Sequence, residues 1–271
     1  MSMPEEGSPG GAAAEADAPK LSVVVPTFNE RENLPRLAEA LFRALDGAGV
    51  RGELVVVDDD SPDGTAEAAL EIAGRDPAPP QAGEARPGEE DRRSSGGTLH
   101  PVHVLVRRGR KGLSSAVLEG VAAARAPVVC VMDADLSHPP EAVPLLYYEV
   151  LSGADIAVGS RLVEGGGVED WPLGRRLISK GATLLARPLT PVHDPMSGFF
   201  CFRRSLVRGA RLEPEGYKIL LEILARCDIA RAVEVPYIFR DRRAGRSKLS
   251  GRVMRQYLRH LLRLYASRVA G

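Results

Sequence analysis

The segment Val131-Met-Asp-Ala-Asp-Leu-Ser-His-Pro-Pro140 decides the fold class, because it joins a buried strand to a pair of carboxylates. The apolar residues 127–132 are typical of a strand inside a sheet, and the two prolines end it. Asp133 and Asp135 are two positions apart, so on an extended chain their side chains point to one face. Two carboxylates this close repel each other unless a cation lies between them, and a divalent metal on a diphosphate meets that need. A solvated turn with this tripeptide by chance is the alternative.

Two further strand ends carry polar residues in the same way. Residues 21–30 read LSVVVPTFNE and residues 54–65 read LVVVDDDSPDGT, so each apolar run breaks into a polar turn. Strand and helix patterns alternate from residue 21 to residue 160, which predicts an α/β fold with a mostly parallel central sheet flanked by helices. Ligands of such sheets bind outside the carboxyl ends of the strands. Three acidic or polar strand ends therefore predict a nucleotide-diphosphate site that contains a metal.

Hydrophobic periodicity predicts the positions of the elements. Glycines 165–167 are a hinge or lid candidate, and residues 241–250 form a basic loop. We expect helices over residues 31–45, 65–73, 114–124, 141–151, 171–186, 217–225 and from 251 onward. We expect strands over residues 21–27, 54–57, 102–106, 128–132, 155–159, within 194–202, and over 232–239.

Composition bounds the class of protein. The chain has 36 Lys and Arg against 36 Asp and Glu, so overall charge gives no reason to expect nucleic-acid binding. Its three cysteines have neither disulfide nor metal-ligand spacing. We therefore expect them to be reduced core residues of a protein that faces the cytosol. Residues 1–20 lack the apolar region of a signal peptide and are predicted to be a disordered tail. Residues 75–98 are predicted to be a disordered insertion. Residues 21–271 are then one domain, with no apolar run near the roughly 20 residues of a membrane span.

The ordered motifs resemble glycosyltransferase family 2 with the GT-A (Rossmann-like) fold, and within it the dolichyl-phosphate mannosyltransferases. The resemblance covers about nine-tenths of the chain. The matching segments are residues 26–34, 57–65, 133–140, 159–161, 175–182, 194–199 and 247–249. Phe28 stands where many relatives have tyrosine, and Ser137 where some have a glutamine metal ligand.

The resemblance implies roles for the residues at the strand ends. Asp133, Asp135 and Ser137 would hold Mg²⁺ or Mn²⁺ across the diphosphate of GDP-mannose. The nucleotide-binding set it implies is Pro26, Phe28, Glu30, Val57, Asp59, Asp133, Ala134, Asp135, Arg161, Arg242 and Lys248. For residues 58–60, a cluster of aspartates that caps the turn before Ser61 is the alternative.

The implied acceptor is dolichyl phosphate, a phosphate monoester whose second pKa is near 6. Such an anion is already a nucleophile at neutral pH, so the site needs cations and no general base. The catalytic residues implied are Asp135, Arg161, Arg175, Ser179, Arg242 and Lys248; solvated surface cations are the alternative. His138 either orients the metal loop or is a packed turn histidine. In-line displacement implies inversion, giving dolichyl β-D-mannosyl phosphate for N-glycan, O-mannose and GPI-anchor synthesis.

Residues 251–271 predict a basic amphipathic helix. Its apolar stripe either lies in an anionic membrane surface or packs on the domain. The resemblance implies a peripheral enzyme on the cytosolic face of the endoplasmic reticulum membrane, held there by small membrane-anchoring subunits. Two other functions stay open: a polyprenyl-phosphate glycosyltransferase that uses UDP-glucose or another donor, and a non-catalytic nucleotide-sugar-binding subunit.

Overall fold

The computed structural model describes residues 18–75, 100–109, 112–169, 171–213, 218–240 and 251–270. Residues 1–17 of the predicted tail (1–20), residues 76–98 of the predicted insertion (75–98) and the basic loop at 241–250 lie outside the described residues. Arg75, which the sequence placed in the insertion, ends a helix.

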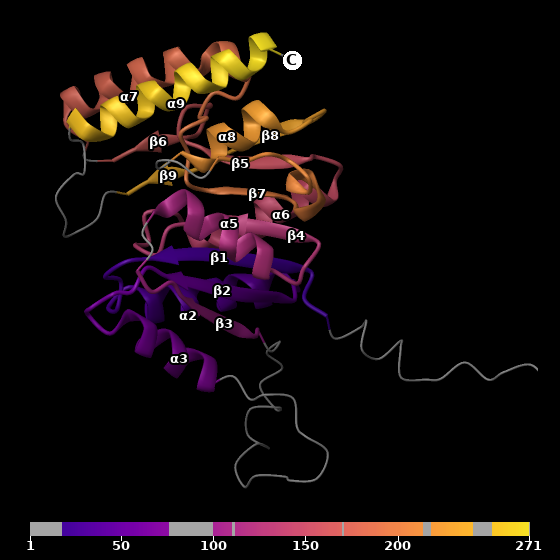
Figure 1. The fold of residues 1–271 in the computed structure, drawn as a ribbon. Helices are drawn as coiled ribbons and strands as arrows, with labels where there is room; N and C mark the ends of the chain where they lie inside the picture. Colours follow the sequence, from indigo (N-terminus) through magenta and orange to yellow (C-terminus); the bar gives the residue numbers. More distant parts are fainter. Residues whose placement is uncertain are drawn as a thin grey trace, which may run out of the picture.

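A seven-stranded sheet forms the centre of the molecule (Figure 1). Its order is β3-β2-β1-β4-β7-β5-β8, and every pairing is parallel except those of β7, which runs antiparallel to β4 and β5. The strands are β1 (Leu21–Thr27), β2 (Gly52–Asp58), β3 (Val102–Val106), β4 (Val128–Val131), β5 (Ile156–Ser160), β7 (Phe200–Arg203) and β8 (Ala232–Pro236). The predicted mostly parallel α/β sheet is thus confirmed.

Two helical layers cover the sheet, since the central strands are apolar on both faces. One face packs against α2 (Leu34–Gly47), α3 (Thr65–Arg75) and α6 (Val143–Leu151), and the other against α5 (Leu113–Ala123) and α8 (Ile219–Arg226). A 3-10 turn, Pro140–Ala142, precedes α6. Two more, Arg187–Leu189 and Arg204–Val207, follow helix α7 (Leu173–Ala186) and strand β7.

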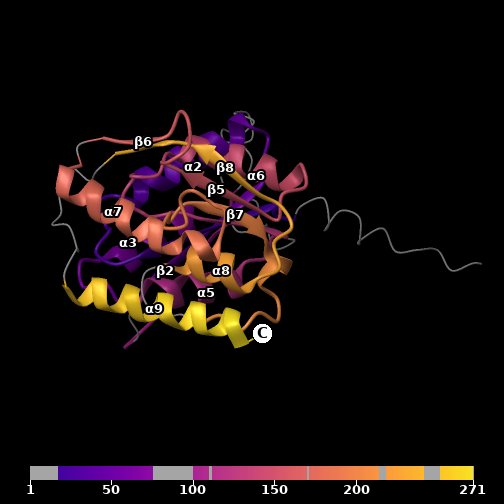
Figure 2. The ribbon, with the colours of Figure 1, turned by 90° about the horizontal axis from the view of Figure 1, so that it is seen from above.

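Two helices lie beside this sandwich at the end opposite β3 (Figures 1 and 2). They are α7 (Leu173–Ala186) and α9 (Gly251–Ala270). Tyr257 and Tyr265 of α9 donate their hydroxyls to the carbonyls of Ala182 and Leu185 of α7, at 2.6 Å and 2.5 Å. The predicted C-terminal helix is confirmed. Tyr257 and Leu261 of its apolar stripe are buried against α7 and α8 together with Leu264, whereas Leu258 and Leu262 of the stripe are exposed.

Two expectations about short segments change. The predicted strand 232–239 is two strands, because β9 (Ile238–Phe239) leaves the main sheet to pair with β6 (Gly167–Val168). Gly167, expected in a hinge, is therefore part of a paired strand. Cys130 and Cys201 face each other in register across β4 and β7 as free, buried thiols.

Candidate active site

Four parallel strands, β1, β2, β4 and β5, end at the same edge of the sheet. Within the described residues, non-glycine residues with positive φ occur only in the loops after three of these strands. They are Asn29 (61°), Asp60 (57°) and Leu136 (60°). Backbone strain of this kind gathers at functional sites. The edge predicted from the sequence is thus also where the described backbone is most strained.

Asp58 caps the turn that follows β2. Its buried carboxylate accepts hydrogen bonds from Thr27 Oγ1 at 2.9 Å, Ser61 Oγ at 2.6 Å and the Ser61 N–H at 2.9 Å. For this aspartate, the geometry matches the turn-capping alternative. Asn29 N–H also donates to Ser61 Oγ, at 3.0 Å, so the loops after β1 and β2 are tied together.

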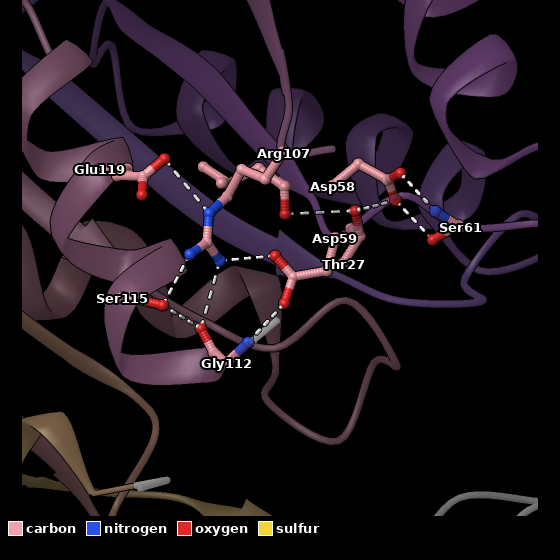
Figure 3. A network of polar contacts seen from close by, with 9 residues as sticks. Thr27, Asp58, Asp59, Ser61, Arg107, Gly112, Ser115 and Glu119 are labelled. Atoms are coloured by element: carbon pink, nitrogen blue, oxygen red, sulfur yellow. Dashed lines mark hydrogen bonds and ion pairs between the residues drawn. The ribbon is translucent and has the colours of Figure 1, made fainter. Parts of the chain in front are cut away.

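Asp59 is held by a network of polar contacts (Figure 3). Arg107 Nη1 donates to Asp59 Oδ1 at 2.5 Å, and the Gly112 N–H donates to Oδ2 at 2.8 Å. Arg107 also donates through Nη2 to Ser115 Oγ at 2.6 Å and through Nε to Glu119 Oε2 at 3.2 Å. Each carboxylate oxygen keeps a further lone pair for a ligand. The orientation of Asp59 therefore depends on Arg107, at the end of β3.

The other predicted nucleoside residues lie in β1 and β2 or in the loop after β1. Pro26 and Val57 are register partners in β1 and β2 and are buried. Phe28 exposes 40% of its surface, so its ring is accessible for stacking. The Glu30 carboxylate accepts a hydrogen bond from Asn33 Nδ2 at 2.8 Å.

Asp133 and Asp135 lie directly after β4. Ser137 donates to Asp135 Oδ1 through its hydroxyl at 2.6 Å and its N–H at 3.1 Å, so it orients that carboxylate. Ala134, between the aspartates, is buried. In the described part of the chain, no cluster of three or more His, Cys, Asp or Glu side chains could hold a metal. Two carboxylates suit Mg²⁺ or Mn²⁺ all the same, because Mg²⁺ is usually held by one or two carboxylates plus substrate phosphates.

His138 is a packed turn residue next to this pair. Its Nδ1 accepts a hydrogen bond from the Asp133 N–H at 3.0 Å, and its ring stacks on Phe199 with centroids 5.1 Å apart. Burial lowers the pKa of His138, so the neutral form is favoured, with its proton on Nε2. The His138 ring thereby packs against the loop that carries Asp133 and Asp135.

Arg161 and Asp194 form a buried, two-pronged ion pair. Arg161 Nε and Nη2 donate to the Asp194 carboxylate at 2.7 Å and 2.8 Å. The guanidinium also lies 5.5 Å from the ring centroid of Trp171 and 5.6 Å from that of Phe239. Burial opposes the charge of Arg161, but the hydrogen bonds and charge of Asp194 outweigh it and raise the pKa of the arginine. Beside Asp194, His193 Nδ1 lies 2.8 Å from Glu234 Oε2.

The predicted acceptor-side residues lie on the inner side of α7. Arg175 and Ser179 are one turn apart and both partly buried, and the Arg175 guanidinium lies 4.1 Å from the ring centroid of Trp171. The guanidinium groups of Arg161 and Arg175 thus both contact the Trp171 ring. Arg242 and Lys248, the other predicted cations, lie outside the described residues.

Two residues of this edge were not among the predicted site residues. Arg107 holds Asp59 across 48 positions of sequence, and its only sequence signal is an arginine directly after a strand. Lys218 precedes α8, and its ammonium donates to the carbonyl of Met196 at 3.0 Å. No spacing pattern links Lys218 to residues 194–199.

The family model of glycosyl transferase family 2 matches residues 22–82 and 89–209. The chain belongs to glycosyl transferase family 2. Known members of the family resemble this glycosyltransferase over most of its length. The dolichol-phosphate mannosyltransferase of Pyrococcus furiosus is 46% identical over 90% of the chain, which spans 63% of that relative's length. That of Saccharomyces cerevisiae is 39% identical over 90% of the chain and 86% of its own length.

A further relative of this glycosyltransferase is the polyprenol monophosphomannose synthase of Mycolicibacterium smegmatis. It is 36% identical over 94% of the chain and 92% of its own length. Among solved structures, glucosyl-3-phosphoglycerate synthase of Mycobacterium tuberculosis, in complex with Mn²⁺, UDP-glucose and phosphoglyceric acid, aligns with a TM-score of 0.60. The alignment covers 93% of this chain and 81% of the synthase chain at 22% sequence identity, so the likeness concerns the GT-A fold alone.

Proposed function

We propose that this glycosyltransferase transfers mannose from GDP-mannose to a polyprenyl phosphate such as dolichyl phosphate, with inversion at the sugar carbon. The observation that carries the proposal is the carboxylate pair after β4, at the same edge of the sheet as the Asp59 network and the buried Arg161. The names of the relatives supply the sugar and the acceptor class.

The residues of this edge would have different roles in the transfer step. A phosphate oxygen of the acceptor attacks the sugar C1, the bond from C1 to the diphosphate breaks, and GDP leaves with the electron pair. Asp133 and Asp135 would hold Mg²⁺ or Mn²⁺, which neutralises charge developing on the diphosphate. A phosphate monoester needs no base. His138 is not positioned as one, because its Nδ1 is occupied and its ring is packed on Phe199.

The test is transfer of radiolabelled mannose from GDP-mannose to dolichyl phosphate, with and without chelator. We expect lipid-extractable product that chelation abolishes and Mg²⁺ or Mn²⁺ restores. Asp135→Ala should lower transfer at least roughly 100-fold, since a bound metal supplies several kcal/mol to such a step. Unchanged transfer in Asp135→Ala, with its thermal unfolding also unchanged, would rule out the metal role.

Donor choice has a separate test, because the solved neighbour described above carries UDP-glucose. Titration calorimetry with Mn²⁺ should show tighter binding of GDP than of UDP. The opposite ranking would overturn the mannose assignment and favour a polyprenyl-phosphate transferase with another donor. Nucleotide binding without any transfer would instead favour a non-catalytic binding subunit.

We also propose that the enzyme works on a membrane surface, where a polyprenyl phosphate resides. No helix in the described ranges is long and apolar enough to cross a bilayer. On α7, however, Leu173, Leu177 and Leu184 share one face and are 78%, 70% and 72% exposed. The sequences of α7 and α9 hold three and five Arg or Lys, respectively, and no Asp or Glu. An apolar row among cations suits an anionic lipid surface.

Vesicle co-sedimentation tests this surface. Leu177→Ser combined with Leu184→Ser should lower the bound fraction on vesicles that contain anionic lipid, while GDP binding stays unchanged. Leu70→Ser, at a leucine of α3 that is 58% exposed, is the matched control. Equal binding of all variants would contradict the α7 surface. The cytosolic face of the endoplasmic reticulum and small membrane-anchoring subunits belong to the same proposal, and co-purification from detergent extracts tests them.

A further inference from the structure

Lys218 contacts the loop that borders the carboxylate pair. Its ammonium donates to the carbonyl of Met196, in the loop of residues 194–199. This loop begins at Asp194, which Arg161 holds, and reaches Gly198 beside the metal loop. A Cβ added to Gly198 would lie 3.4 Å from Asp133 Oδ2 and 3.2 Å from His138 Cε1. Lys218 and Asp133 are therefore connected through one short segment.

The charges around Lys218 leave its ammonium poorly compensated. Burial, and then the like charge of Arg161, lower the pKa of Lys218 to about 8, while Asp194 and Asp133 act in the opposite direction. Asp194 already accepts two hydrogen bonds from Arg161. In the described residues the acceptor that we find for Lys218 is one neutral carbonyl, although an ammonium has three donors. A partly buried ammonium with one hydrogen-bond acceptor is stabilised when an anion joins it.

We propose that Lys218 binds a phosphate oxygen of a substrate beside Asp133. The inference rests on the proposed function, which brings two phosphate-bearing substrates to this edge of the sheet. These are the diphosphate of the nucleotide sugar and the monoester of the acceptor. Both offer the charged oxygen that a compact ammonium binds well. The competing role is purely structural: Lys218 would do no more than hold the Met196 carbonyl.

Two substitutions separate these roles. Lys218→Met keeps a long apolar stem and removes the charge, whereas Lys218→Arg keeps both the charge and the ability to donate to Met196. Lys20→Met is the matched control, at an exposed lysine just before β1. Thermal unfolding of each variant, titration calorimetry with GDP and Mn²⁺, and the KM and kcat for both substrates are then measured.

We expect Lys218→Met to lose at least about tenfold in kcat/KM, the loss of one charge-assisted hydrogen bond, and Lys218→Arg to recover most of it. Weaker GDP binding would assign the contact to the donor diphosphate. A higher acceptor KM with unchanged GDP binding would assign it to the acceptor. The alkaline fall of kcat/KM near pH 8 in the native enzyme should move upward in Lys218→Arg, whose side chain stays charged.

The proposal is overturned if Lys218→Met keeps kcat/KM within about twofold of the native value, which is less than the loss of a typical hydrogen bond. It is also overturned if both variants lose activity only in proportion to their loss of thermal stability. A native enzyme that transfers no mannose rejects the proposed function instead. In that case the role of Lys218 is tested by binding alone. GDP and a short-chain polyprenyl phosphate are each titrated into the native protein and into Lys218→Met, and equal affinities of the two proteins would reject the phosphate contact.

Discussion

At the scale of single residues, the site depends on charges that hold one another in place. Arg161 is fixed by Asp194, and Asp59 is fixed by Arg107. Charge-assisted hydrogen bonds of this kind carry direction as well as energy. The side chains predicted to meet a ligand are thus oriented before a ligand arrives, which lowers the ordering cost of binding.

The Arg161–Asp194 pair should also matter for stability. Asp194→Asn leaves a largely buried guanidinium without its counter-charge, so we expect the free energy of unfolding to fall by about 3 kcal/mol. Urea denaturation measures this. Glu39→Gln breaks the exposed pair with Arg43 and should change stability by less than about 1 kcal/mol. Equal effects of the two substitutions would show that burial does not strengthen the Arg161 pair.

At the scale of elements, close packing of helices on the sheet sets the shape of the site edge. Gly120 of α5 faces β1 and β2, where an added Cβ would overlap a methyl group of Val24 and lie 3.0 Å from Val57 Cγ2. Only glycine lets α5 approach this closely. The Asp59 network therefore depends on Gly120, because Ser115 and Glu119 belong to the same helix and Glu119 directly precedes this glycine.

The same substitution at two glycines should have opposite effects. Gly120→Ala overpacks the core and should destabilise the protein by roughly 1–3 kcal/mol. Gly181→Ala, in α7, meets nothing within 4 Å and should stabilise it by roughly 0.5–1 kcal/mol through helix propensity. The thermal unfolding midpoints of the two variants and of the native protein measure these effects. A stabilising Gly120→Ala would contradict the close approach of α5.

The contact between α8 and α9 should be sensitive to acid. Burial tends to raise the pKa of Glu222, but the hydrogen bonds from His260 and Glu213 and the charge of Arg226 lower it below its ordinary value of 4.5. A carboxylate with a depressed pKa stabilises the fold above that ordinary value and loses this contribution as the pH falls through the folded pKa. We expect stability to drop below about pH 4.5. Glu222→Gln should flatten this drop, and the exposed Glu141→Gln should leave it unchanged.

At the scale of the whole molecule, local patterns predicted the elements well and the contacts between distant segments poorly. The strand at residues 102–106 has the bounds that its apolar run predicted, and the polar ends of β1, β2 and β4 do meet at one edge. The local hydrophobic pattern cannot predict that β7 lies antiparallel between β4 and β5. It also cannot report that Arg107 reaches Asp59, because neither fact leaves a periodic trace in the sequence.

The C-terminal helix shows the same limit at larger scale. Its apolar stripe could be read from the sequence, but the surface that covers the stripe could not. The structure places α7 and α8 against Tyr257, Leu261 and Leu264, while Leu258 and Leu262 of α9 stay exposed together with the leucines of α7. A stripe predicts that burial occurs, whereas the burying partner is decided by tertiary packing.

The reversed direction of β7 has a consequence for how this family can vary. Most loops at the catalytic edge leave a strand and can change length at little cost. The segment of residues 194–199 instead enters a strand that is hydrogen-bonded on both sides. One inserted residue would either push Gly198 into Asp133 or shift β7 by one position and turn its side chains to the wrong faces. Among the loops of this edge, we therefore expect the loop of residues 194–199 to vary least in length between members of the family.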